Sequence, residues 1–320
     1  MVRRAFVIIL ALVSAACGAS EVRTTASPAA SSSTPASSIA AAPTATPRTP
    51  LPSGSRLEDL AVQFAYDAAV PIGIVERGTA LDGTLTVRDI EFTGARGGRA
   101  RAYLITPPTS GPHPAMVFVA GSNEARDGIR PDALAVARRG VVTLVLEQSQ
   151  LAAARPQIWT FTAQDREEAI ETVLDARRAI DLLVARADVD RTRVGYYGFS
   201  YGAWLGAITA AVDKRVNLVV LRSGGPQILT ELARASSRTL APGYVALMAT
   251  VDQMIYAPSI AGAVLVQNGS RDTTYTAEQM KAWQERIGGT KTVKIYDAAH
   301  TLDAPANADV TSWIAERWRL

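Results

Sequence analysis

Residues 198–202, Gly-Phe-Ser-Tyr-Gly, carry the clearest chemical signal in the chain. They follow an apolar run at 193–199 and open a run of small and apolar residues at 201–212, which predicts a strand, a sharp turn and a helix. A serine in such a turn has strained backbone, and a Cβ two positions before or after it would clash, so glycine suits both positions. The pattern predicts that Ser200 is an exposed nucleophile.

Two further apolar runs, at 261–268 and 291–296, end in the residue types that a nucleophilic serine needs. Asp272 follows the first run and His300 follows the second. A serine hydroxyl needs a base that titrates near neutral pH, which histidine provides, and a carboxylate can orient that histidine. We therefore expect Ser200, Asp272 and His300 to meet at one edge of a sheet.

Other residues compete for the same roles. Asp297 and Asp303 are close in sequence to the expected base, but neither follows a strand in the expected order, so Asp272 is the predicted acid. Glu147 stands at a strand end and is expected to be structural. The only other histidine, His113, lies between two prolines before a strand, and this context predicts a solvated loop.

The positions of these residues require strands that alternate with helices. Alternation of this kind predicts an α/β fold with a mostly parallel sheet flanked by helices. A segment at 226–258 has helical character and contains no clear strand, so it is a possible helical cap over the site, although a helical core segment would have the same pattern. The expected strands are 85–92 and 101–105, as a hairpin around 94–98, then 115–120, 141–147 and 216–221; the expected helices are 131–139, 162–186, one that starts with a capping box at 276–279, and one at the C-terminus.

The N-terminal part has a different composition. Residues 1–17 have a short basic start, an apolar stretch too short to span a bilayer, and small residues before Cys17, which predicts a signal peptide with a lipobox-like end. Lipidation of Cys17 would make the protein a cell-envelope lipoprotein; the alternative is a plain secretory signal and a secreted protein. Residues 18–55 are rich in Ala, Ser, Thr and Pro and predict a disordered tether, followed by one folded domain at 56–320.

Composition excludes several other classes of function. The formal net charge is +3, and no basic stripe with interleaved aromatic residues occurs, so no nucleic-acid partner is expected. Two histidines and one cysteine cannot supply the usual zinc clusters, and there is no glycine-rich phosphate loop, so neither a metal nor a cofactor is expected. The sequence does not determine the oligomeric state.

Residues 189–195, Val-Asp-Arg-Thr-Arg-Val-Gly, which lead into the 198–202 turn, make the chain resemble the α/β-hydrolase superfamily. The resemblance covers roughly residues 85–320 and is closest to the dienelactone hydrolase-like and acetyl xylan esterase-like group of serine hydrolases, with prolyl oligopeptidase-type domains nearby. It implies the α/β-hydrolase fold. True dienelactone hydrolases carry a cysteine nucleophile, whereas this chain has Ser200, which favours ordinary esters as substrates.

The resemblance also implies residue roles. Ser200 would attack an acyl carbon, His300 would carry the proton, and Asp272 would orient the imidazole. The oxyanion would be bound by the backbone N–H groups of Tyr201 and Ser122, although family members often have His-Gly where this chain has Ala120-Gly121.

These expectations favour an exported hydrolase of small-molecule or polymeric carboxylic esters, with membrane contact only through a lipid anchor. Two alternatives remain at this point: a serine peptidase of the prolyl oligopeptidase type, and a surface lipoprotein that uses the fold for binding without catalysis.

Overall fold

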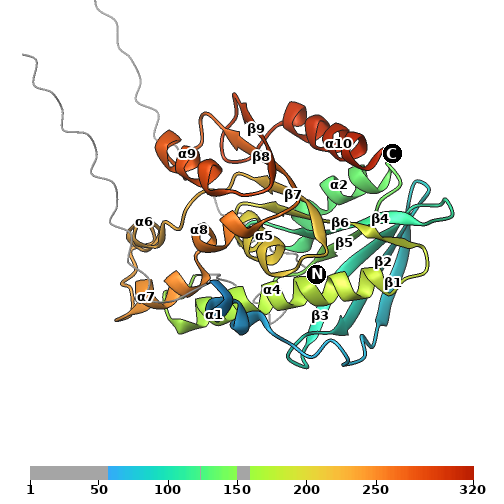
Figure 1. Cartoon of the computed structure of the whole chain (residues 1–320), viewed down its shortest axis with the longest axis horizontal. Helices are drawn as coiled ribbons and strands as arrows, with labels where there is room; N and C mark the ends of the chain where they lie inside the picture. The colour runs from blue at the N-terminus through green and yellow to red at the C-terminus, as the bar shows by residue number, and fades with distance from the viewer. Residues whose placement is uncertain (1–56, 123, 150–158) are drawn as a thin grey trace, which may run out of the picture. The chain divides into compact units, whose positions relative to one another are not determined.

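A nine-stranded sheet forms the centre of the computed structural model, which describes residues 57–122, 124–149 and 159–320 (Figure 1). The strand order is β1-β2-β3-β5-β4-β6-β7-β8-β9. The strands from β4 to β9 pair in parallel, whereas β1, β2 and β3 pair antiparallel, as do β3 and β5. The strands are β1 Val75–Asp82, β2 Leu85–Thr93, β3 Arg99–Thr106, β4 His113–Val119, β5 Val142–Leu146, β6 Val189–Phe199, β7 Val216–Arg222, β8 Ala263–Gly269 and β9 Thr290–Tyr296.

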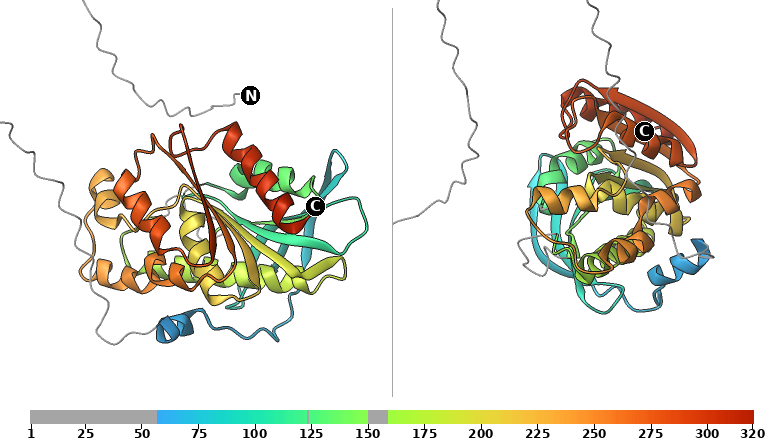
Figure 2. Two further views of the ribbon diagram at one scale, coloured as in Figure 1. Left: turned by 45° about the horizontal axis from the view of Figure 1, so that its top comes forward. Right: turned by 90° about the vertical axis from the view of Figure 1, so that its left-hand side faces the viewer.

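Helices cover both faces of this sheet, as Figure 2 shows. Successive side chains of a strand point to opposite faces, and in β4 Val117 belongs to one apolar cluster while Met116 and Phe118 belong to another. The first cluster includes residues of α4, α5 and α9, and the second includes residues of α2 and α10. The longer helices are α2 Arg126–Ala137, α4 Ala163–Val184, α5 Tyr201–Val212, α9 Ala277–Arg286 and α10 Ala304–Trp318.

This arrangement confirms the predicted α/β-hydrolase fold and its mostly parallel sheet. The central strands β4 and β5 are buried along their whole length, as expected for parallel strands with helices on both faces. The predicted hairpin is also present, since β2 and β3 pair antiparallel from Thr93 and Arg99 outwards. At α9, the Thr276 side chain and the Gln279 side chain form the expected capping box.

Two expectations about single elements were wrong, and one strand was not predicted. Strand β1 had not been expected; its residues are almost all exposed, so it lacks the apolar alternation by which strands are recognised. Helix α2 begins at Arg126 and holds Pro131 within it, whereas we expected Pro131 to start the helix. His113 is the first residue of β4 and is buried, which rules out a solvated loop there.

The segment at 226–258 is helical, as predicted. It contains α6 Leu229–Ala235, α7 Tyr244–Met248, η2 Ala249–Val251 and α8 Gln253–Tyr256, and η3 Ala257–Ser259 ends it. Helix α8 packs against α5, and α7 packs against α4. Much of the segment is therefore built into the helical layer, and a covering role for the rest stays a prediction.

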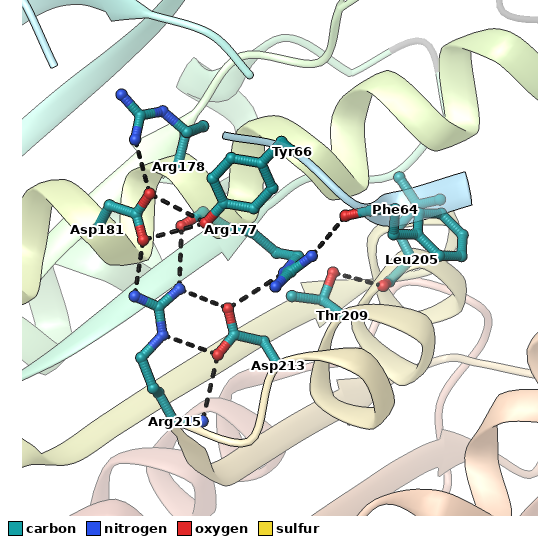
Figure 3. A network of polar contacts seen from close by, with 9 residues as sticks. All are labelled: Phe64, Tyr66, Arg177, Arg178, Asp181, Leu205, Thr209, Asp213 and Arg215. Atoms are coloured by element: carbon teal, nitrogen blue, oxygen red, sulfur yellow. Dashed lines mark hydrogen bonds and ion pairs between the residues drawn. The ribbon is translucent and has the colours of Figure 1, made fainter. Parts of the chain in front are cut away.

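A network of hydrogen bonds and ion pairs joins the start of the described chain to α4 (Figure 3). The segment begins with α1 Leu57–Ala61 and η1 Val62–Phe64. Beyond them, the Tyr66 hydroxyl donates to the Asp181 carboxylate at 2.9 Å, and Arg215 bonds both Asp181 and Asp213.

None of the helices in the described ranges is long and apolar enough to span a membrane.

Candidate active site

Ser200 occupies the sharp turn between β6 and α5. Its φ of 53° and ψ of −110° lie outside the regions that a non-glycine residue prefers, a strain of about 1–3 kcal/mol. The backbone holds this conformation from both sides, because the Ser200 N–H donates to the Arg222 carbonyl at 2.8 Å and the Ser200 carbonyl accepts the Ala203 N–H at 2.9 Å. The strain therefore presents the serine hydroxyl beyond the carboxyl end of the sheet.

The two flanking glycines are required by close backbone contacts. A Cβ at Gly198 would lie 2.1 Å from the Gly202 carbonyl oxygen. A Cβ at Gly202 would lie 2.1 Å from the Val119 carbonyl oxygen at the end of β4. Neither neighbour can move away easily, because both are main-chain atoms, so no larger residue fits this turn.

Ser200, His300 and Asp272 meet in a single chain of hydrogen bonds. The Ser200 Oγ and the His300 Nε2 are 2.8 Å apart, and the His300 Nδ1 lies 2.8 Å from the Asp272 Oδ2. The aspartate side chain has no exposed surface, while 25% of the histidine side chain is exposed. A hydroxyl, an imidazole and a buried carboxylate in this order can move a proton away from the serine.

The surroundings of Asp272 keep it ionised. Burial raises the pKa of its carboxyl group, but the hydrogen bond from His300 and those from the backbone N–H groups of Thr274 and Tyr275 outweigh that effect and leave the pKa below its ordinary value. The Thr274 N–H donates at 2.7 Å. A carboxylate fixed in this way favours the imidazole tautomer that carries its hydrogen on Nδ1.

The competing carboxylates have other partners. Asp297 pairs with Arg271 at 2.8 Å, and 87% of its side chain is exposed. Asp303 caps the N-terminus of α10, where it accepts the Ala306 N–H. Glu147 accepts the backbone N–H of Arg126 at 3.1 Å. The structure gives none of the three a bond to His300 within its described part.

The loop that carries His300 is fastened to two neighbouring strand ends. The Arg271 N–H donates to the Ala298 carbonyl at 2.9 Å, which joins the Asp272 loop to the His300 loop. The Ser223 hydroxyl donates to the His300 carbonyl at 2.6 Å, and Ser223, directly after β7, has a φ of 51°. We had not singled out Ser223 from the sequence, although it occupies the same place after a strand as the other site residues.

The two amides predicted to bind an oxyanion, those of Tyr201 and Ser122, have no backbone acceptor among the described residues. Tyr201 is the first residue of α5, so its N–H has no partner within the helix. The Ser122 N–H, in the loop after β4, has no acceptor in the part of the chain that the structure describes. A Cβ at Gly202 would lie 2.8 Å from the Ala120 carbonyl oxygen, which places the start of this loop against the first turn of α5.

The second histidine is part of the core. The His113 Nδ1 lies 2.9 Å from the Gly140 carbonyl oxygen, and its Nε2 lies 2.9 Å from the Thr109 carbonyl oxygen. Both ring nitrogens are thus engaged with the main chain, and His113 packs the start of β4 against the turn after α2.

Two of the sequence predictions concern other kinds of site. Within the described ranges, no group of three or more His, Cys, Asp or Glu side chains is arranged to hold a metal ion. Cys17, the signal peptide and the tether at 18–55 lie outside the described residues.

Comparison with known proteins agrees with the fold described above. Two acetyl xylan esterases of known structure, from a Paenibacillus species and a Thermoanaerobacterium species, are each 20% identical to the chain, with TM-scores of 0.66 and 0.65; the matches cover 81% of this chain and 91% and 92% of theirs. They share its fold. A curated polyketide transferase of Stachybotrys chlorohalonatus is 27% identical over 161 residues, 49% of this chain, and the chain spans about half the length of that relative. A model of the dienelactone hydrolase family matches residues 100–318, most of the folded part, and the chain therefore belongs to the dienelactone hydrolase family.

Proposed function

We propose that the protein hydrolyses carboxylic esters through a Ser200–His300–Asp272 triad and an acyl-enzyme intermediate. The observation that carries this proposal is the continuous pair of 2.8 Å contacts from the serine hydroxyl through the imidazole to the buried carboxylate. Family membership supports the reaction class.

In the first half-reaction, the Ser200 Oγ attacks the acyl carbon while its proton passes to the His300 Nε2. The negative charge that develops on the acyl oxygen is stabilised by the amides of Tyr201 and Ser122, each worth about 3 kcal/mol to the transition state. His300 then gives the proton to the departing alcohol oxygen, and the bond between that oxygen and the acyl carbon breaks. Asp272 stabilises the imidazolium throughout without taking its proton.

In the second half-reaction, a water molecule takes the place of the alcohol. His300 removes a proton from the water as its oxygen attacks the acyl carbon, and returns the proton to the Ser200 Oγ when the acid leaves. The same acyl-enzyme could pass its acyl group to a second alcohol, and one relative is named as a transferase. Measuring free acid against transferred ester, with methanol present as acceptor, separates hydrolysis from transfer.

The proposal is tested with p-nitrophenyl esters of increasing acyl length. Wild type should release p-nitrophenol with turnover. Ser200→Ala should not exceed the uncatalysed rate by more than about 10³- to 10⁴-fold, which is the rate enhancement that binding and the oxyanion site provide without the triad. Equal turnover by both proteins would refute the proposal. Cleavage of proline-containing peptides without ester turnover would favour a peptidase instead.

We also propose export and lipidation at Cys17, with residues 18–55 as a tether. Small residues before a lone cysteine after an apolar stretch support this assignment. A Cys17→Ala variant should accumulate as unprocessed precursor, which immunoblotting against wild type would detect. Normal cleavage and release of the variant would identify a plain secretory signal.

A further inference from the structure

The loop after β4 contains an amide that has no acceptor among the described residues. The Gly121 N–H donates to the Glu124 carboxylate at 3.1 Å, and the Glu124 N–H donates to the Gly121 carbonyl at 3.3 Å. The Ser122 N–H lies between them and has no acceptor within the described part of the chain. Because backbone donors near the core are normally paired, an amide with no acceptor among the described residues, in a loop whose start lies against the first turn of α5, is available for a substrate oxygen.

A buried side chain helps to fix which way this amide points. Gln148 follows β5 by two residues and is 1% exposed. Its Nε2 donates to the Ala120 carbonyl at 2.9 Å and to the Gly121 carbonyl at 2.8 Å. A trans peptide group holds its C=O and N–H on opposite sides, so the Gly121 carbonyl, turned toward Gln148, directs the Ser122 N–H away from it.

We propose that Gln148 is the positioning residue of the oxyanion site, and that it acts through the peptide group between Gly121 and Ser122. This inference rests on the function proposed above and adds a residue to it. Gln148 does not touch the substrate; it holds the donor in the orientation that a developing oxyanion needs.

The chemistry of the side chain explains why a glutamine suits this position. One amide nitrogen carries two hydrogens, and two consecutive carbonyl oxygens accept them. A carboxylate of the same shape would face those oxygens with negative charge. A methionine would remove the donor to the Ala120 carbonyl and leave the Gly121 carbonyl with only the Glu124 N–H, at 3.3 Å. The loop also packs closely against Phe199, because a Cβ at Gly121 would lie 2.9 Å from the Phe199 ring.

The test compares Gln148→Met with wild type in p-nitrophenyl ester hydrolysis. We expect kcat to fall by up to about 10²- to 10³-fold, the range for loss of one oxyanion donor, while KM changes little. Affinity for a trifluoromethyl ketone, which forms a tetrahedral oxyanion on the serine, should fall in proportion to kcat/KM. Gln63→Met is the matched control, since Gln63 also donates to a backbone carbonyl, that of Thr250, and to the Tyr256 hydroxyl; it should retain kcat.

A double-mutant cycle separates positioning from general damage. Ser122→Pro deletes the amide hydrogen, so adding Gln148→Met to it should cost less than threefold more if both act on one donor. Gln148→Glu, which has nearly the same shape, provides the same comparison if Gln148→Met does not unfold cooperatively. Wild-type kcat in Gln148→Met and Gln148→Glu, or a multiplicative effect in the double variant, would overturn the inference. Neither result would affect the proposed function, which Ser200→Ala tests separately.

Discussion

The carboxyl group of Asp175 should make the stability of the fold depend on pH, and Asp175→Asn should remove that dependence. Asp175 lies in α4 and is 5% exposed. Its Oδ1 has no hydrogen-bond partner in the described structure, and a Cβ at Gly94 would lie 2.7 Å from that atom. Burial, with a smaller contribution from Glu171, raises the pKa of this carboxyl group from 3.8 to about 7, although Ala95, Arg96 and Arg178 oppose the change.

The sign and size of the effect follow from the two pKa values. Between pH 3.8 and about 7 the folded protein holds a proton on Asp175 that the unfolded chain has released, so the free energy of unfolding falls as the pH rises. One pH unit of difference corresponds to about 1.4 kcal/mol, so the loss between pH 4 and pH 8 reaches about 4 kcal/mol. The contribution is fully present below pH 3.8 and is lost above about pH 7.

Urea unfolding of wild type and Asp175→Asn at several values between pH 4.5 and pH 8 measures this directly. The free energy of unfolding of the variant minus that of wild type should increase with pH by a few kcal/mol. Any constant cost of burying the amide cancels in this comparison. Asp297→Asn, at an exposed aspartate, should show no such trend. A difference between wild type and Asp175→Asn that is the same at every pH would refute the reasoning.

Three other substitutions have defined outcomes. Asp272→Asn should fold normally but lower kcat by about 10⁴-fold, because the amide favours the wrong imidazole tautomer. The kcat of Asp297→Asn should stay within about twofold of wild type, since exposed ion pairs contribute little. A larger loss of kcat in Asp297→Asn than in Asp272→Asn would reassign the acid. In a urea titration, Gly202→Ala should lower the free energy of unfolding by about 3 kcal/mol or abolish folding, because its Cβ overlaps the Val119 carbonyl. Gly78→Ala, with nothing within 4 Å of the added Cβ, should leave the free energy of unfolding nearly unchanged in the same titration. Ser223→Ala should lower kcat by about tenfold with KM little changed, because His300 loses a hydrogen bond to its carbonyl. Ser237→Ala, at an exposed serine with a similar φ, is its control. Equal kcat values in Ser223→Ala and Ser237→Ala would contradict a role for Ser223 in positioning His300.

The sequence predicted those site residues whose position depends only on the end of the strand that precedes them. Ser200 follows β6, Asp272 follows β8 and His300 follows β9, so recognising the strand before each of them was enough to place it. The choice of Asp272 over Asp297 used the same rule, and the structure brings Asp272 to the imidazole.

Contacts between distant loops could not be predicted in this way. Ser223 and Gln148 also follow strands, but their partners are main-chain carbonyls of other loops, and nothing in the types of those residues marks the pairing. The prediction for His113 was wrong for a related reason. The flanking prolines indicate a turn, yet a backbone carbonyl lies within hydrogen-bond distance of each ring nitrogen, so a ring N–H has an acceptor and the ring can be buried. Strand β1 lies at the edge of the sheet and pairs with β2 alone. Its side chains are almost all exposed, so its sequence has no apolar alternation that would predict a strand.

The central claim, that Ser200 is a nucleophile activated by His300 and Asp272, is tested most directly by covalent labelling. Wild type should react with a fluorophosphonate probe, and peptide mass spectrometry should place the adduct on Ser200. Labelling should be absent in Ser200→Ala and slowed by orders of magnitude in His300→Ala, since the hydroxyl then lacks its base. An adduct on a different residue, or labelling of His300→Ala at the wild-type rate, would contradict the account.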